Sequence, residues 1–303
     1  MSHSEVETPI QTIGPGPTRP LTISAYVPFS NNAETVLEAI RSVAAQTLPP
    51  ESIVAIDDGS TDGGAELLEA QGFRVVRNQR NLGRGATRNR AMLESTGDLV
   101  LSCDATNRIA PEFVEQALPW FADPRVAAVF GRMLDPHPEG VAGRWRARHL
   151  LKCKAEMPAS RCGSLSTGGA LLRRSAVLGV GNFDVALRHS EDAELGERLA
   201  AAGFDIAFDP RVAVFCNIRN TIPQVLERYW RWHAGRDERV TWLAYLRLVS
   251  YSVKGMIALD LADRDPQSAL ISVICPHYQF WRSKGRRKRA ERGPGFSCLS
   301  ITG

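Results

Sequence analysis

Short apolar runs alternate with amphipathic runs over the first third of the chain, and this alternation constrains the fold more than any other feature. Strands are predicted at residues 21–27, 52–56, 73–77 and 99–103. Each of the first three leads into a predicted helix, and the first helix ends before Pro49-Pro50. A repeated order of strand and helix favours a mostly parallel sheet that is covered by helices on both faces.

Acidic residues follow two of these strands. Asp57 and Asp58 follow the second strand, and Asp104 follows the fourth. Open α/β sheets bind ligands beyond the carboxyl ends of their strands, and a carboxylate there can hold a divalent cation and, through it, a phosphate. Ordinary tight turns use the same residues, because Asp-Gly is a turn signal. A nucleotide site and structural turns both stay open at this point.

A glycine-containing loop precedes the third helix. Its Gly83-Arg84-Gly85 lacks the third glycine of a dinucleotide fingerprint and is weak evidence for one. Arginines at the start of a helix oppose the helix dipole, so a bound anion is the simplest explanation of Arg84 and Arg88.

Several motifs stand in a fixed order along the chain. They are Ile56-Asp-Asp-Gly-Ser-Thr-Asp62, Asn81-x-Gly83, Arg88-Asn89, Gly97-Asp98, a strand ending in Asp104, Gly168-Gly169, Gly181-Asn182-Phe183-Asp184 and Glu191-Asp192. The ordered set resembles the family 2 glycosyltransferases of the GT-A fold. The resemblance implies a mostly parallel GT-A sheet flanked by helices, with a helical C-terminal extension, and inverting, hexosyltransferase-type transfer from a nucleotide-diphospho-sugar.

Site residues follow from the resemblance, with Arg84 added from the helix argument. Those expected to bind the nucleotide-sugar are Pro28, Ser30, Asp58, Arg84, Arg88 and Asp104. Asp192 is the expected general base, and those expected at the acceptor are Glu191, Trp230, Arg231 and Trp232. Two other interpretations stay open: acids in a first turn also suit the helix dipole, and aromatic residues of the segment 228–232 also suit a helix core.

Two positions depart from the family pattern. The metal motif Asp-x-Asp reads Asp104-Ala105-Thr106 here, so Asp104 is the only carboxylate ligand expected for Mg²⁺ or Mn²⁺. Because phosphates and waters complete the shell of such a cation, one carboxylate can suffice at reduced affinity. A histidine that the family often carries is replaced by Cys216-Asn217, and His233 is a possible substitute for it.

Composition restricts the environment of the protein. The chain has 303 residues, 44% of them hydrophobic, with no run of apolar residues long enough to cross a bilayer. Its six cysteines form no CxxC pair, and no signal peptide precedes them, so reduced thiols and a cytoplasmic location are expected.

The C-terminal end combines an apolar and a basic stretch. Residues 269–281 carry no charge, and seven Lys or Arg with one Glu follow between Arg282 and Arg292. This order favours peripheral attachment to an anionic membrane at its inner face. A packed helix with a solvated basic end and a nucleic-acid-binding tail are the alternatives, and nucleic acid is not the expected partner.

The sequence therefore predicts four regions. Residues 1–19 are a disordered segment, 20–235 a GT-A domain, 236–281 a helical, apolar, membrane-proximal extension, and 282–303 a basic tail. The expected acceptor is a saccharide or a lipid-linked precursor of a surface glycan. A nucleotidyltransferase and a non-catalytic sugar-nucleotide-binding protein with a degraded metal motif are the competing functions.

Overall fold

The chain divides into two compact units. The computed structural model describes residues 19–135, 137–161, 164–216, 218–233 and 240–285. The first unit comprises residues 1–134 and 155–218, and the second comprises 135–154 and 219–303. The sequence analysis placed one boundary at 235, whereas residues 219–235 group with the second unit. Residues 1–18 and 286–303, and with them most of the predicted tail, lie outside the described residues.

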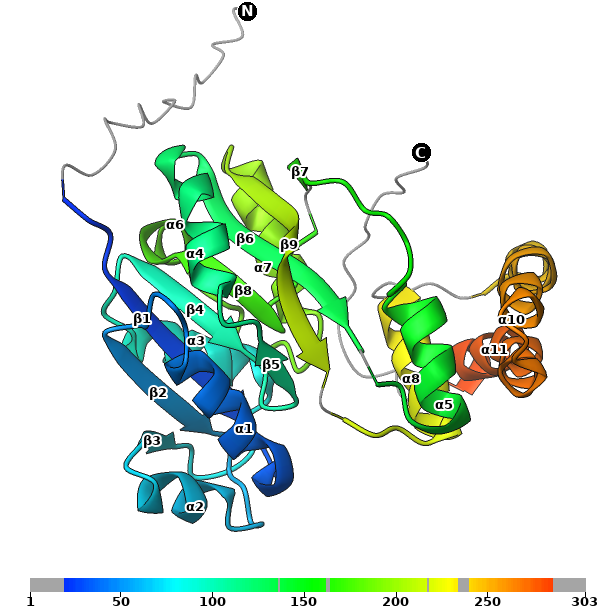
Figure 1. Cartoon of the computed structure of the whole chain (residues 1–303), viewed down its shortest axis with the longest axis horizontal. Helices are drawn as coiled ribbons and strands as arrows, with labels where there is room; N and C mark the ends of the chain where they lie inside the picture. The colour runs from blue at the N-terminus through cyan, green and yellow to red at the C-terminus, as the bar shows by residue number, and fades with distance from the viewer. Residues whose placement is uncertain (1–18, 136, 162–163, 217, 234–239, 286–303) are drawn as a thin grey trace, which may run out of the picture. The chain divides into compact units, whose positions relative to one another are not determined.

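The first unit is built on one sheet, which Figure 1 shows with its strands labelled. The strand order is β3-β2-β1-β4-β8-β6-β9-β5, and β7 pairs with β9. β3, β2, β1 and β4 run parallel to one another, whereas β8 runs antiparallel to β4 and β6, and β5 antiparallel to β9. The strands are β1 Ile23–Phe29, β2 Ser52–Asp57, β3 Arg74–Arg77, β4 Leu99–Cys103, β5 Asn107–Ile109, β6 Val126–Leu134, β7 Ser160–Arg161, β8 Gly169–Arg173 and β9 Asp205–Cys216.

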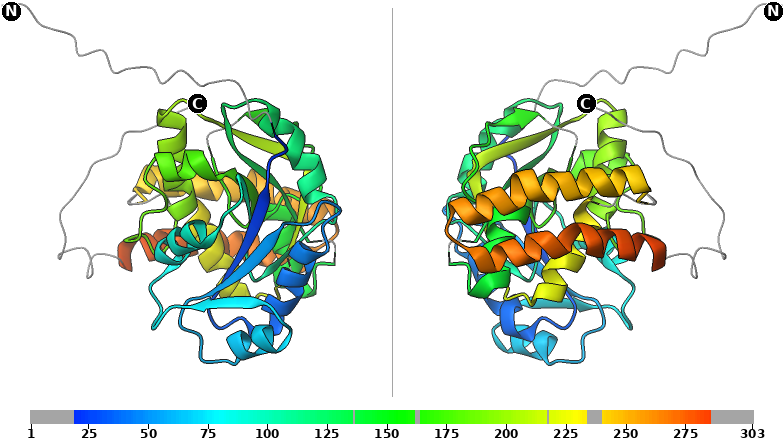
Figure 2. Two further views of the ribbon diagram at one scale, coloured as in Figure 1. Left: turned by 90° about the vertical axis from the view of Figure 1, so that its left-hand side faces the viewer. Right: turned by 90° about the vertical axis from the view of Figure 1, so that its right-hand side faces the viewer.

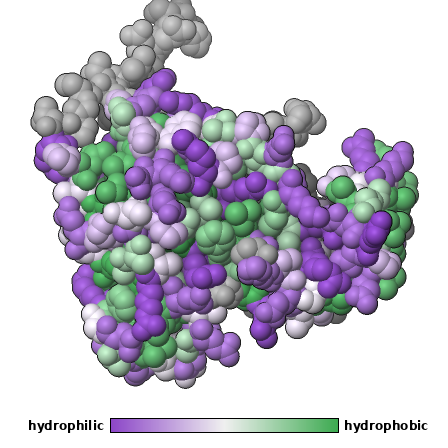
Figure 3. Space-filling model, viewed as in Figure 1, coloured by the Kyte–Doolittle hydropathy of each residue, from purple (hydrophilic) through white to green (hydrophobic). Residues whose placement is uncertain are grey.

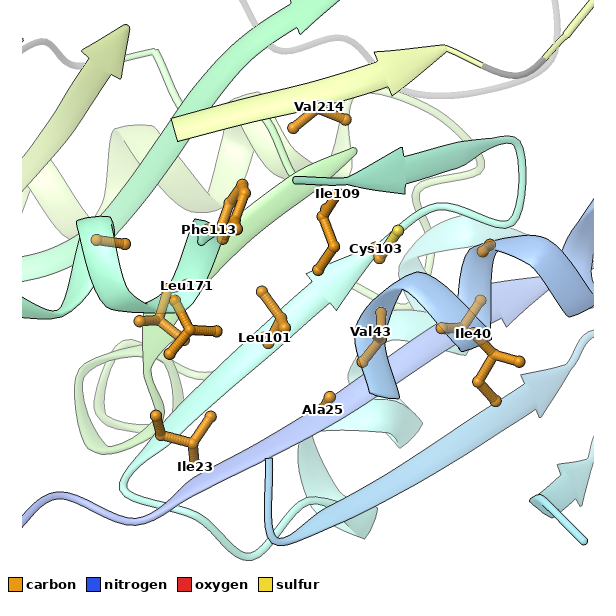
Figure 4. Close-up of a cluster of buried hydrophobic side chains, with 14 of the residues drawn as sticks. Ile23, Ala25, Ile40, Val43, Leu101, Cys103, Ile109, Phe113, Leu171 and Val214 are labelled. Carbon is orange, nitrogen blue, oxygen red and sulfur yellow. The ribbon is translucent and has the colours of Figure 1, made fainter. Parts of the chain in front are cut away.

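Helices cover both faces of this sheet because each contributes one apolar stripe. On one face, Ile40 and Val43 of α1 point toward Ala25 of β1 and Leu101 of β4, as Figure 4 shows. On the other face, Met92 and the apolar residues of two later helices form a second cluster. The helices of this unit are α1 Ala33–Ala44, α2 Gly64–Ala70, α3 Arg84–Glu94, α4 Phe113–Ala117, the 3₁₀-helix η1 Leu118–Ala122, α6 Arg174–Gly179 and α7 Glu191–Ala201.

The predicted fold class is confirmed, with one extension. β9 runs parallel to β6 and is 12 residues long, so it extends the sheet beyond the four strands that were predicted. The register shifts between Gly131 and Arg132, where the two strands approach closely. A Cβ atom at Gly131 would lie 2.0 Å from the carbonyl oxygen of Val212, so only glycine fits there without a shift of the backbone.

The second unit is helical. Its elements are α5 Gly140–Trp145, the π-helix η2 Arg146–Leu150, α8 Ile222–His233, α9 Trp242–Tyr251, the π-helix η3 Ser252–Ile257, α10 Ala258–Ala262 and α11 Pro266–Gly285. α9, η3 and α10 run on without a break and α11 returns beside them, so residues 242–285 form a helical hairpin, seen from outside in the right view of Figure 2. Among the described residues, no helix combines the length and the apolarity that a bilayer crossing requires.

Two sets of buried hydrogen bonds stabilise the helical hairpin. Pro276 lies inside α11 and has no N–H to donate to the carbonyl of Ser272. The buried Ser252 hydroxyl of η3 donates to that carbonyl instead, at 2.5 Å. The buried carboxylate of Asp260 bonds His149 at 2.7 Å and accepts from Ser272 Oγ at 2.6 Å. Burial lowers the pKa of His149, although Asp260 opposes that shift.

Candidate active site

The carboxyl ends of β1, β2 and β4 lie at one edge of the sheet, because the three strands are parallel neighbours. β2 ends at Asp57 and β4 at Cys103, so Asp58 and Asp104 both leave the sheet there. This is the placement that the sequence analysis expected for them. The side chains around Asp104 come from five separate segments of the first unit, and they define the candidate site.

Asp58 supports the loop that leads into α3. Its Oδ1 accepts hydrogen bonds from the Asn78 side-chain amide at 2.9 Å and the Leu82 N–H at 2.8 Å, and its Oδ2 accepts from the Gly83 N–H at 2.9 Å. A carboxylate offers about four acceptor positions, and three of them are occupied here. These contacts are those of a structural turn, and they leave one acceptor position of the carboxylate unused by the described residues.

The other expected nucleotide contacts differ in exposure. Pro28 and Ser30 are half-buried, and the Ser30 hydroxyl donates to the Asp58 carbonyl at 3.2 Å and accepts from the Asn81 amide at 3.0 Å. Arg84 is exposed at the first position of α3 and has no carboxylate partner within the described part of the chain. Of the two arginines in α3 that were singled out, Arg84 is the one available to solvent.

Arg88 is buried at the centre of the site, with 3% of its side chain exposed. Its guanidinium donates to Asp104 Oδ1 at 2.5 Å, to Glu191 Oε1 at 3.0 Å and to Ser102 Oγ at 3.1 Å. Burial opposes the charge of Arg88, but Asp104, Tyr26 and Glu191 outweigh it and raise its pKa. Arg88 therefore joins two acids of the site, whereas the sequence analysis expected it to face the phosphates of the donor.

Asp104 keeps one carboxylate oxygen for a ligand. Its side chain is 30% exposed, and its Oδ2 accepts no hydrogen bond from any residue that the structure describes. A Cβ atom at Gly168 would lie 3.6 Å from this oxygen, so the glycine leaves space beside it. No three Asp, Glu, His or Cys side chains in the described ranges gather as a metal site requires. Asp104 thus fits a divalent cation only as a single carboxylate ligand, with water or phosphate completing the shell.

Asp192 lies in the first turn of α7, next to this cluster. Its Oδ1 accepts from the Ala193 N–H at 2.9 Å and its Oδ2 from the Thr167 N–H at 3.5 Å. Burial raises the pKa of Asp192, and the charge of Glu191 raises it further, whereas Arg88 lowers it. A carboxyl with a raised pKa is a better proton acceptor than an ordinary aspartate, which suits a general base.

Glu191, which the sequence analysis expected at the acceptor, is 1% exposed. Its role in the structure is to hold Arg88. Its Oε2 and the Thr167 hydroxyl are both buried, and neither has a hydrogen-bond partner among the residues that the structure describes. Thr167 was missed in the sequence analysis, although it directly precedes the Gly168-Gly169 motif that was quoted there. Tyr26, within 3.4 Å of Arg88, gave no signal because it reads as one more residue of an apolar strand.

The remaining acceptor residues lie on α8 in the second unit. Trp230 is buried there, as is its neighbour Tyr229, which packs against the Trp145 ring with centroids 5.4 Å apart. Trp232 is 51% exposed and Arg231 is also exposed. The core interpretation of this segment therefore holds for Tyr229 but not for Trp232. Asn217 and the side chain of His233 lie outside the described residues.

Comparison with known proteins finds polysaccharide synthases among the relatives of this chain. The chain is 25% identical over 223 residues to the poly-beta-1,6-N-acetyl-D-glucosamine synthase of Staphylococcus aureus (strain COL), covering 69% of this chain and 53% of that protein. The Staphylococcus epidermidis protein of the same name is 24% identical over 226 residues, covering 71% and 55%. The chain thus spans about half the length of these curated relatives.

Solved structures share the fold at low identity. The mannosyltransferase PcManGT from Pyrobaculum calidifontis, in complex with GDP-Man and Mn²⁺, matches with a TM-score of 0.62 and 17% identity over 94% of this chain and 92% of that one. S. aureus TarS 1–349 in complex with UDP-GlcNAc matches with a TM-score of 0.55 and 18% identity over 90% and 77%.

The family itself is shown by the sequence. Residues 24–179, just over half of the chain, match the family described as Glycosyl transferase family 2. This range contains the acidic strand ends, Arg88 and Asp104, and it stops before Glu191 and Asp192. The chain belongs to glycosyl transferase family 2, and it is a glycosyltransferase of the GT-A fold.

Proposed function

We propose that the protein is an inverting glycosyltransferase that moves a sugar from a nucleotide-diphospho-sugar to a hydroxyl acceptor, with Asp192 as the general base. The observation that carries the proposal is the position of Asp192 beside the Arg88–Asp104 pair, with burial and Glu191 raising its pKa. The base and the predicted cation ligand come from α7 and the end of β4, so one site contains both groups.

The proposed reaction follows from this placement. Asp192 accepts the proton of the acceptor hydroxyl as that oxygen attacks the anomeric carbon, and a proton transfer of this kind contributes about 10²–10⁴-fold in rate. The bond from the anomeric carbon to the phosphate oxygen breaks on the opposite face, and the diphosphate leaves with inversion. A Mg²⁺ or Mn²⁺ ion held by Asp104 would neutralise charge on that diphosphate.

The protein's own residues have supporting roles in this proposal. Asp58 and Ser30 hold the loop before α3, and they and Pro28 are the residues proposed to contact the nucleotide. Arg84 is free to approach a phosphate. Arg88 is a positioning residue, because its ion pairs hold Asp104 and Glu191 in place.

The acceptor is proposed to be a saccharide or a lipid-linked glycan precursor at the cytoplasmic face of a membrane. The basic stretch from Arg282 onward supports this location, and its first residues belong to α11. The Arg282 guanidinium donates to the Glu227 carboxylate of α8 at 2.7 and 2.9 Å, so the first residue of the stretch is held against α8.

The test is the Asp192→Asn variant in an assay of transfer, paired with calorimetric titration of the donor. Transfer should be lost while donor affinity stays near the wild-type value, since the base acts on the acceptor. Glu194→Gln on the same helix is the matched control, because Glu194 pairs with Arg198 and does not contact the cluster. A turnover of Asp192→Asn close to that of Glu194→Gln would eliminate Asp192 as the base.

A further inference from the structure

The helical hairpin of residues 242–285 exposes large apolar side chains on both of its helices. On α11 they are Leu270, Val273, Ile274 and Trp281, spaced to share one side of the helix, and they are 45–69% exposed. On α9, η3 and α10 they are Trp242, Leu243, Leu246, Tyr251, Val253, Leu259 and Leu261, 54–66% exposed. Figure 3 shows apolar surface along the right-hand edge, over α10 and α11.

The sequence analysis based membrane attachment on the uncharged segment 269–281 and the basic stretch after it, and only part of that segment is exposed. Ile271, Cys275 and Gln279 of that segment face inward and are buried. The extension predicted to lie near a membrane, residues 236–281, also contains α9, whose first turn carries Trp242 and Leu243. Exposed apolar side chains therefore come from two antiparallel helices that lie side by side, and they are distributed along the helix axes.

The hairpin carries acidic residues that are paired and, within the described residues, basic residues that are not. Its acids are Asp260, Asp263 and Asp265, and each of them is bound by Arg148, which lies outside the hairpin. The exposed cations are Arg247, Lys254, Arg264 and Lys284, and no carboxylate in the described ranges pairs with any of them. The hairpin therefore offers positive charge beside apolar side chains.

Aromatic residues and a lysine gather at the open end of the hairpin. The Trp242 and Phe280 rings lie 4.8 Å apart, and Lys284 Nζ lies 4.1 Å from the Phe280 centroid and 5.2 Å from that of Trp242. Trp281, in the same turn of α11, is 69% exposed. Tryptophan and lysine have apolar bodies and polar ends, and both favour the boundary between acyl chains and water.

We infer that the hairpin is an interfacial membrane-binding element that lies flat on an anionic bilayer, with the outward residues of α9 and α11 among the lipid headgroups and acyl chains. Surface helices bind in this way through apolar burial together with attraction to anionic lipid. A second copy of the chain is a poorer occupant, since a two-fold interface would bring like-charged arginines and lysines together. The inference rests on the proposed function only in that a lipid-linked acceptor would be met at such a surface.

The test is co-sedimentation of the full-length chain with vesicles of phosphatidylcholine, with and without phosphatidylglycerol, across a salt series. The wild type should bind the anionic vesicles, and salt should weaken the binding without abolishing it. Leu246→Gln with Leu270→Gln, one change on each helix, should weaken binding by about tenfold or more at every salt concentration. Leu93→Gln is the matched control, because Leu93 is 61% exposed on α3 of the first unit.

A charge variant separates the two contributions. Arg247→Gln with Lys254→Gln should weaken binding to anionic vesicles at low salt and reduce its salt dependence. Failure of the wild type to bind either kind of vesicle overturns the inference. The inference is also overturned if sedimentation velocity shows a dimer, and the Leu246→Gln, Leu270→Gln variant is a monomer that binds vesicles as the wild type does. Transfer to a soluble acceptor, followed in the same preparations, tests the proposed function separately, because vesicle binding does not need catalysis.

Discussion

Replacing Arg88 by methionine removes the one cation that joins the acids of the candidate site. The guanidinium donates to Asp104 at 2.5 Å and to Glu191 at 3.0 Å, and only 3% of the side chain is exposed. Removing one member of a buried ion pair costs about 3–5 kcal/mol, since its partner's charge stays buried and unpaired. At about 2–4 °C per kcal/mol for a domain of this size, Arg88→Met should lower the Tm by about 6–20 °C. Thermal unfolding followed by circular dichroism at pH 7 measures the change.

Two further variants make this experiment specific. Arg74→Met is the control, because the Arg74–Glu94 pair lies at the surface, where an ion pair is worth about 0–1 kcal/mol. Adding Glu191→Gln to Arg88→Met should recover part of the loss, since the buried unpaired charge is then removed as well. An Arg88→Met protein that melts within about 2 °C of the wild type would refute the reasoning.

Three other outcomes are expected. Gly85→Ala should lower the Tm, because its Cβ would lie 2.0 Å from the Asp184 carbonyl oxygen. Gly179→Ala, with no atom within 4 Å of its Cβ, should leave the Tm unchanged. Equal Tm values for the two variants would contradict this. Asp104→Ala should weaken donor binding in the presence of Mn²⁺, and a wild type whose affinity and activity ignore EDTA would argue against a cation. Because the pKa of Asp192 is raised in the folded protein, its charge destabilises the fold as the pH rises above the ordinary aspartate value. Asp192→Asn should therefore melt at or above the wild-type Tm at pH 7. The acidic limb of the wild-type kcat/KM profile should have its midpoint above the ordinary pKa of an aspartate.

The parallel half of the sheet could be predicted because local sequence determines it. β4 has the predicted bounds, since Leu99 to Cys103 form an apolar run closed by Asp98 on one side and Asp104 on the other. β1 ends at Phe29, two residues beyond the predicted end at Val27, because it pairs with Asp57 at the end of β2. Strand pairing, which a single strand does not encode, decides such ends.

Contacts between distant segments could not be predicted. The Asn32 side chain at the N-cap position of α1 makes no capping hydrogen bond, and the Ala33 N–H donates instead to Asp62 Oδ2 at 2.8 Å. Asp62 belongs to the turn after β2, so the cap depends on the fold already being formed. The pairing of Arg88 with Glu191 likewise joins positions 103 apart. Asp192, Asp104 and Arg88 could be named from motifs, whereas the burial that raises the pKa of Asp192 could not.

The hydroxyl of Ser252 that bonds the Ser272 carbonyl makes two positions on different helices interdependent. Pro276 creates the unpaired carbonyl, and Ser252 supplies the donor that satisfies it, so neither residue is neutral without the other. Ser252→Ala should be harmful while Pro276 is present, at about 1–3 kcal/mol for a buried acceptor left without a donor. In a chain with Pro276→Ala, a restored backbone N–H reaches the same carbonyl, and the loss of Ser252 should then matter less. Sliding α11 by one turn, about 5.4 Å, would separate the two groups, so this bond, together with that from Ser272 Oγ to Asp260, favours one register for the helical hairpin.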